Sequence, residues 1–101
     1  MIRELYQVYK ILKWHKKTFP DHSYYDQRKH HVSEMHEWME AMRNFTKRKT
    51  ATNKNHLKEE QADVIISGIA LLRFDESFQS VIDKMEINYG RTWEDDHHKE
   101  N

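Results

Sequence analysis

The chain has 101 residues, a mass of 12.5 kDa and 17 residues of each charge, so its formal net charge is zero. This balance argues against a general polyanion binder, and we expect no nucleic-acid partner. The absence of cysteine excludes disulfides and thiolate metal sites and is typical of a cytoplasmic protein. No apolar run approaches the ~20 residues of a membrane span, so we expect one soluble domain over residues 1–101 without a membrane partner.

With only two glycines and one proline, the chain lacks the turn residues that a many-stranded protein needs, and we predict an all-α fold. Apolar residues recur at helical spacing in four segments. The predicted helices run from about Ile2 to Phe19, from Asp26 or Gln27 to Phe45, from His56 to Arg73, and from Asp75 or Ser77 to Gly90. A basic segment, Lys47 to Asn55, is predicted to be a loop, and a charged tail begins at about residue 94.

The apolar residues of the helices predict a core. The third helix is apolar in nearly every direction, so we expect it to be central and buried on most sides. The stripe predicted for the second helix contains Val32, Met35, Trp38, Met39, Met42 and Phe45, and that of the fourth contains Phe78, Val81, Ile82 and Met85. Together with the three tryptophans and five methionines, these faces contain more apolar surface than four short helices can bury within one subunit. We therefore predict a homodimer, or a tetramer built as a dimer of dimers.

Two acidic pairs carry the functional hypothesis. Glu34 and Glu37 stand at i, i+3 on the second helix, and Glu60 and Asp63 stand at i, i+3 on the third. Taken alone, the first pair is more simply a solvated face, but the second lies on an apolar helix, where unpaired carboxylates are costly. Two such helices packed face to face would bring four carboxylates together. Hard divalent cations prefer oxygen ligands, so we predict a Mg²⁺ site, with Mn²⁺ as a substitute.

The order of three motifs resembles the all-α nucleoside triphosphate pyrophosphohydrolases of the MazG-like superfamily, whose relatives act on dUTP and dCTP. The motifs are Glu-x-x-Glu at Glu34, Glu-Glu-x-Ala-Asp-Val from Glu59, and Lys-x-x-x-Asn-x-x-Arg from Lys84. The resemblance covers roughly Lys29 to Trp93. Many members carry two consecutive glutamates at the start of the first motif, whereas Ser33 takes the first of those places here.

The resemblance implies a fold, a reaction and a set of site residues. The fold is a four-helix bundle, and the reaction is Mg²⁺-dependent hydrolysis of a nucleoside triphosphate to the monophosphate and pyrophosphate, which serves nucleotide-pool house-cleaning. Glu37 or Glu34 would orient or deprotonate the attacking water. The implied metal ligands are Glu34, Glu37, Glu60 and Asp63, and the implied phosphate-binding residues are Lys84, Asn88 and Arg91.

Base recognition is less defined by the sequence. The candidates for stacking on a base or hydrogen-bonding to it are Trp38, His30, His31 and Tyr25. Trp38 lies among methionines and is more simply a core or interface residue, and the two histidines are more simply surface residues. Two other functions remain open at this point: a catalytically weak nucleotide-binding or sensing protein, and a structural helical dimer. A structural dimer should show no Mg²⁺-dependent change in melting temperature.

Overall fold

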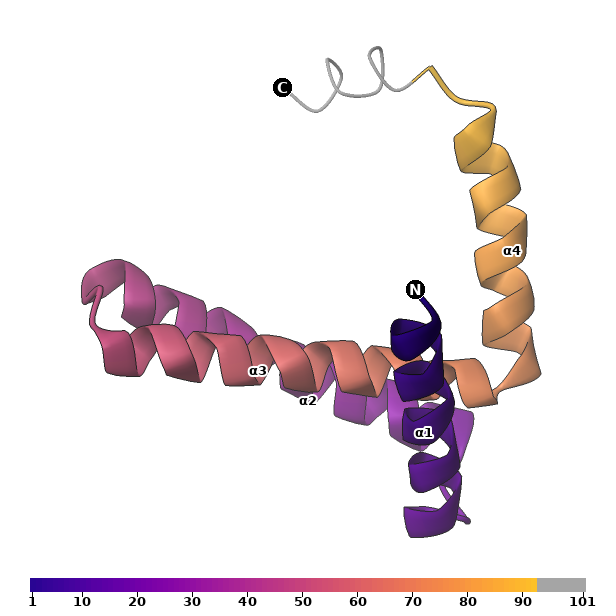
Figure 1. Cartoon of the computed structure of the whole chain (residues 1–101), viewed down its shortest axis with the longest axis horizontal. Coiled ribbons are helices and arrows are strands. Elements are labelled where there is room, and N and C mark those ends of the chain that lie inside the picture. Colours follow the sequence, from indigo (N-terminus) through magenta and orange to yellow (C-terminus); the bar gives the residue numbers. More distant parts are fainter. Residues whose placement is uncertain (93–101) are drawn as a thin grey trace.

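The computed structural model describes residues 1–92, without the side chains of residues 75–77. Within that part the chain forms no strand, which confirms the all-α prediction. The elements are α1 (Ile2–Thr18), α2 (Tyr24–Lys47), α3 (Ala51–Ala70), the 3₁₀ helix η1 (Leu71–Arg73) and α4 (Asp75–Tyr89). Figure 1 labels the α-helices. No described helix is long and apolar enough to cross a membrane. The charged tail predicted from about residue 94 lies outside the described residues.

The helices α2 and α3 form a hairpin with a tight turn, where the sequence predicted a loop over Lys47–Asn55. That prediction was wrong for residues 51–55, which belong to α3. The segment shows no apolar periodicity, but it contains the capping residue that starts the helix. The hydroxyl oxygen of Thr50 accepts a hydrogen bond from the backbone N–H of Asn53 at 3.1 Å and so caps α3. The Asn53 amide in turn donates to the Arg48 carbonyl at 2.9 Å, which joins the end of α2 to the start of α3.

The two hairpin helices meet along a seam whose residues alternate spacings of four and three, as in a coiled coil. The seam residues, all partly or fully buried, are Gln27, His31, Glu34, Trp38, Ala41 and Phe45 on α2 and Asn53, Leu57, Glu60, Val64 and Ser67 on α3. The stripe predicted for the second helix is therefore only partly confirmed. Trp38 and Phe45 are in the seam and Met35 is half-buried, but Val32, Met39 and Met42 are exposed. Two of the polar seam residues of α2, Gln27 and His31, form hydrogen bonds with Ser67 on α3.

One such residue is Gln27, whose side chain is fully buried between three elements. Its amide nitrogen donates to the Ser67 carbonyl at 2.8 Å, and its amide oxygen lies 2.7 Å from Nε2 of the buried His15 on α1. Arg73 in η1 donates to Nδ1 of the same ring at 2.9 Å. Because arginine only donates, Nδ1 must accept, and His15 is the neutral tautomer that donates from Nε2 to Gln27. Burial and the neighbouring Arg73 both lower the pKa of His15, which agrees with this assignment.

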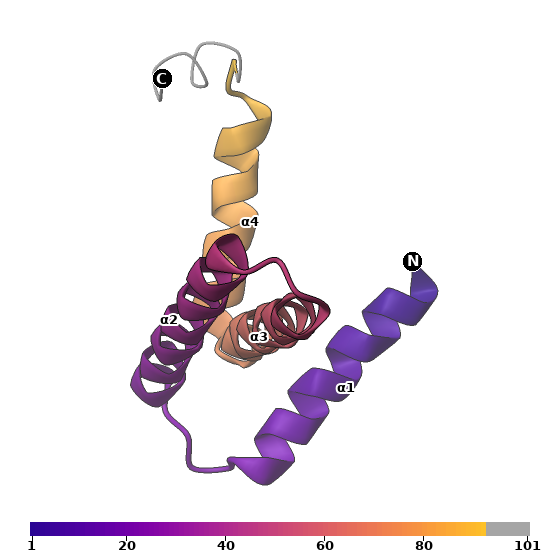
Figure 2. The same cartoon turned by 90° about the vertical axis from the view of Figure 1, so that its left-hand side faces the viewer.

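Arg73 also holds the end of α1. Its guanidinium donates to the carbonyls of Phe19 at 2.9 Å, Pro20 at 3.3 Å and His22 at 3.4 Å, all in the turn between α1 and α2. Carbonyls at a helix C-terminus lack helical partners and carry partial negative charge, so a cation is favourable there. These hydrogen bonds of Arg73 hold α1 across α3 on the side away from α2. The helix α3 is therefore central, as predicted (Figure 2). It is not buried on most sides within one chain, however, because Ile65 is exposed.

The helix α4 leaves this arrangement and, among the described elements, contacts only η1 (Figure 1). Its N-cap is Phe74, which offers no capping side chain, and it ends at Gly90 as predicted. Its predicted buried face is wrong for a single chain. Phe78, Val81, Ile82 and Met85 are 52%, 50%, 42% and 38% exposed, because no other described helix packs against them.

Candidate metal centre

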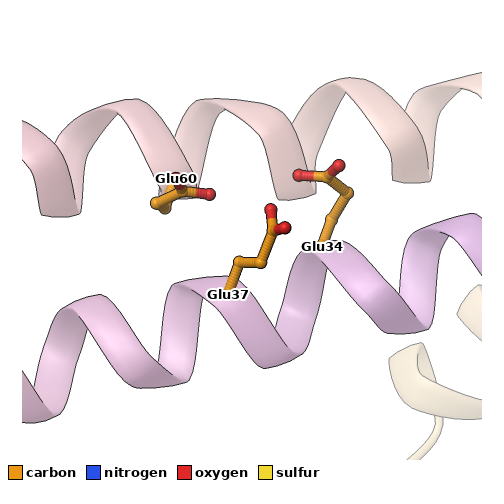
Figure 3. Close-up of side chains that lie close together, drawn as sticks. All are labelled: Glu34, Glu37 and Glu60. Atoms are coloured by element: carbon orange, nitrogen blue, oxygen red, sulfur yellow. The ribbon is translucent and has the colours of Figure 1, made fainter.

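Three carboxylates converge between the hairpin helices. Glu34 and Glu37 extend from α2, and Glu60 extends from α3, into the same space (Figure 3). One carboxylate oxygen from each lies within 4.8 Å of one from each of the others. The i, i+3 spacing puts the first two on one side of α2, and the seam places Glu34 and Glu60 at inward positions. The sequence prediction that the two helices bring their acids together is confirmed for these three residues.

The surroundings of the carboxylates fit a cation. The side chains of Glu34 and Glu60 are only 15% exposed, while Glu37 is open to solvent. In the described part of the chain, the Oε2 atoms of Glu34 and Glu60 are buried without a hydrogen-bond partner. Burial raises the pKa of Glu34, and the nearby Glu37 raises it further. A divalent cation would supply the missing partner for these oxygens and relieve the repulsion between the carboxylates.

Each helix repeats the same spacing around the carboxylates. His30, Glu34 and Glu37 stand at i, i+4 and i+7 on α2, and His56 precedes Glu60 and Asp63 by the same intervals on α3. In each case the histidine Nε2 approaches the first glutamate, at 3.5 Å for His30 and 3.7 Å for His56. His56 was missed from the sequence, although the repeated spacing could have revealed it.

The fourth predicted ligand, Asp63, does not join the three glutamates. Its side chain is exposed and lines the neighbouring cavity, on which Glu34 also borders. Glu40, three residues after Glu37 on α2, is bound to Arg43 at 2.6 Å. This contact lowers the pKa of Glu40 and leaves its charge compensated.

The cavity beside Glu34 has a volume of about 250 Å³. Its walls are mainly aromatic rings from the end of α1 and the following turn, together with residues of α2 and α3. The lining residues are Trp14, His15, Phe19, His22, Gln27, His30, Glu34, Asp63, Ile66, Ser67 and Ala70. Four of the rings contact one another, with centroids 5.2 to 6.2 Å apart. The volume exceeds the roughly 150 Å³ of a cavity that holds benzene, so one planar heterocycle fits.

The four residues predicted to bind a base lie in different places. His30 lines the cavity. His31 is in the seam, where its Nδ1 lies 2.6 Å from the Ser67 hydroxyl and its ring would lie 3.2 Å from a Cβ at Gly68. This contact shows why glycine occurs within α3. Trp38 is also in the seam, and Tyr25 borders a separate shallow hollow with Arg28.

The predicted phosphate-binding residues are not brought to the carboxylates by this chain. Lys84 and Asn88 are on α4, and Arg91 follows it. In the described part of the chain α4 contacts neither α2 nor α3. These residues therefore lie apart from Glu34, Glu37 and Glu60 within one molecule.

Comparison with known proteins gives no assignment: no family model, curated protein or solved structure matches the chain. The geometry of the carboxylates and the cavity is therefore the basis for a proposed function.

Proposed function

We propose that this chain is a Mg²⁺-dependent nucleoside triphosphate pyrophosphohydrolase that releases pyrophosphate and a nucleoside monophosphate, as its resemblance to the MazG-like proteins implies. The observation that supports this function is the convergence of Glu34, Glu37 and Glu60 from two helices, directly beside an aromatic cavity. A cation site next to a slot for one heterocycle suits a nucleotide, whose phosphates need charge compensation and whose base needs a planar apolar surface.

The residues have separate roles in this proposal. Glu34 and Glu60, which are largely buried and have unpartnered oxygens, would hold the cation. The bound cation would neutralise phosphate charge and polarise the attacking water. Glu37 is exposed beside them and would orient that water and accept its proton. Asp63 borders both Glu34 and the cavity, and would limit how closely a phosphate approaches from that side.

The base would enter the cavity beside Glu34. Trp14 and Phe19 form an edge-to-face pair with ring centroids 6.0 Å apart, and His22 stands 5.4 Å from Phe19. Such rings can stack on any base, so they would contribute to affinity more than to selectivity between bases. The base site thus lies nearer to α1 than the residues Trp38 and Tyr25 named from the sequence. His30, at the border between cavity and carboxylates, is the one predicted residue that fits both regions.

A phosphate role for Lys84, Asn88 and Arg91 has a structural condition. Because α4 contacts neither hairpin helix in its own chain, a neighbouring molecule would have to bring these residues to the carboxylates. The alternative is that phosphate charge is compensated by the cation alone.

The test is pyrophosphate release from a panel of canonical and damaged nucleoside triphosphates with Mg²⁺ or Mn²⁺. We expect cation-dependent release that falls by at least about 100-fold in Glu37→Gln and in Glu60→Gln, since each change removes a charged group at the reacting centre. The matched control is Glu59→Gln, an exposed neighbour of Glu60 outside the carboxylate cluster, which should keep full activity. Trp14→Leu should raise KM more than it lowers kcat.

Other results would support other functions. Cation-dependent stabilisation and nucleotide binding without pyrophosphate release would indicate a sensing protein. If the chain releases no pyrophosphate and the cation has no effect on its melting temperature, the proposal is contradicted and a structural helical protein is the remaining function.

A further inference from the structure

Two helix faces of this chain are apolar and without a partner in the described structure. On α4 the face contains Phe78, Val81, Ile82 and Met85, each at least 38% exposed. On α1 the solvent-exposed face, termed the outer face, contains Ile2, Leu5, Tyr6 and Tyr9, which are 84%, 61%, 57% and 58% exposed. Both sets have the spacing i, i+3, i+4, i+7, so each forms one continuous stripe.

The total solvent-exposed area also indicates that these two faces are not covered within one chain. The chain exposes 8499 Å², whereas a compact monomer of its mass would expose about 6200 Å². Even after about 1700 Å² is subtracted for the last nine residues as an extended chain, residues 1–92 expose about 1000 Å² more than the roughly 5700 Å² of a compact monomer of their own mass. A stable protein interface buries about 800 Å² on each partner. The excess is therefore large enough for one interface with a second molecule.

The charges of the two helices are complementary. The helix α1 carries five lysines and arginines and one glutamate, whereas α4 carries four acidic residues and one lysine. Two of the α1 lysines flank the apolar stripe: Lys10 lies 5.3 Å from the ring centroid of Tyr6, and Lys13 lies 6.0 Å from that of Tyr9. On α4, Glu86 follows Met85 and borders the stripe. A basic helix with one exposed apolar face and an acidic helix with another, on the same chain, fit each other across two copies.

We propose that α4 of one molecule packs against the outer face of α1 of a second copy. In a two-fold dimer this pairing occurs twice, because each chain contributes one α1 and one α4. The stripes of Ile2, Leu5, Tyr6 and Tyr9 and of Phe78, Val81, Ile82 and Met85 then cover each other. The interface also explains how α4, a helix of 15 residues that contacts only η1 in its own chain, is stable, since isolated helices of that length are marginal in water.

Sedimentation and light scattering of the full chain in EDTA test the interface independently of the metal site. The native chain should have about twice its mass of 12.5 kDa. Two variants reverse charge on one helix each: Lys10→Glu with Lys13→Glu on α1, and Glu86→Lys, beside the apolar stripe, on α4. Each alone should weaken dimerisation by at least about ten-fold. An equal mixture of the two should form heterodimers, since one contact then pairs both reversed helices and the other pairs both native helices.

The control is Lys54→Glu with Lys58→Glu, which makes the same charge change as the α1 variant on an exposed face of α3 and should leave the dimer intact. Three results would overturn the proposal. These are a native chain that stays monomeric at all concentrations, a dimer that neither reversal weakens, and two reversed variants that fail to associate when mixed. Recovery in the mixture also shows that the variants are folded.

Discussion

The side chain of Gln27 on α2 joins this helix to α1 and α3 by hydrogen bonds. It is completely buried, and both ends of its amide are bonded, one to His15 and one to the Ser67 carbonyl. Gln27→Leu keeps a side chain of similar size but leaves Nε2 of His15 and the Ser67 carbonyl buried without the hydrogen bonds that Gln27 provides. We expect the free energy of unfolding in urea to fall by about 2–4 kcal/mol.

Gln61→Leu makes the same chemical change at an exposed position of α3 and should alter that free energy by less than about 0.5 kcal/mol. Equal effects of the two substitutions would show that the buried network contributes nothing specific.

His15 makes stability depend on pH. Burial and Arg73 lower its pKa in the folded chain, whereas the unfolded chain takes up the proton near pH 6.5. Below that pH the unfolded state therefore binds more protons than the folded state. The stabilisation from neutral His15 is complete above about pH 6.5 and is lost as the pH falls through the folded pKa. The pKa of His31 is lowered by burial too, so it acts in the same direction.

His15→Gln keeps one donor and one acceptor but does not titrate. Urea unfolding between pH 5 and pH 8 should show a smaller loss of stability at low pH than in the native chain. His36→Gln, at an exposed position of α2, should retain the native pH dependence. A native slope in the His15 variant would mean that other groups cause the acid sensitivity.

At the level of single residues, the sequence could predict the carboxylates but not the polar network. Glu34 and Glu37 are paired by a local rule, the i, i+3 spacing on a helix, and Glu60 is conspicuous on an apolar segment. The contact of His15 with Gln27 joins α1 to α2, and that of Gln27 with Ser67 spans 40 residues. Such contacts depend on how helices cross, which periodicity does not encode.

The hairpin turn is the element whose prediction failed, and it suggests a test. Thr50 caps α3 through its hydroxyl oxygen, so Thr50→Ala should lower the free energy of unfolding by about 1 kcal/mol. Thr52→Ala removes the same atoms two residues later, at an exposed position inside the helix, and should be neutral or slightly stabilising. Urea unfolding of both variants distinguishes capping from a general effect of threonine. The sequence contained this signal, but the absence of apolar residues in the segment concealed it.

The pair of hairpin helices should respond to divalent cations as a unit. Mg²⁺ or Mn²⁺ at 100 times its dissociation constant should raise the free energy of unfolding by about 2.7 kcal/mol. Glu34→Gln should abolish this increase. In EDTA it should also stabilise the chain, because it removes a buried charge that Glu37 and Glu60 repel. Glu59→Gln should keep the native response, and a cation effect that survives in Glu34→Gln would place the binding elsewhere.

For the whole molecule, the sequence predicted four helices and an apolar face on the last, but not where that face is used. The stripe from Phe78 to Met85 has the pattern of a core helix, yet in one chain it packs against no other described helix. The helical spacing of apolar residues identifies a face suited to burial, but it does not show which molecule covers that face. The same holds for the outer face of α1, whose stripe from Ile2 to Tyr9 is equally regular. The surplus of apolar surface, which was visible in the sequence, is the basis of the prediction that the chain forms a homo-oligomer.

If a second copy covers α4, the stability of this helix depends on protein concentration. Amide hydrogen exchange should become slower in α4 and in the N-terminal half of α1 as the concentration rises, because association removes the open state of both. The centre of the hairpin, around Glu34 and Glu60, has its partners within the chain and should exchange at a rate set by global unfolding. Exchange in α4 that is fast and independent of concentration would show that the helix has no partner in solution. Slow exchange at every dilution would instead show that it is held by its own chain.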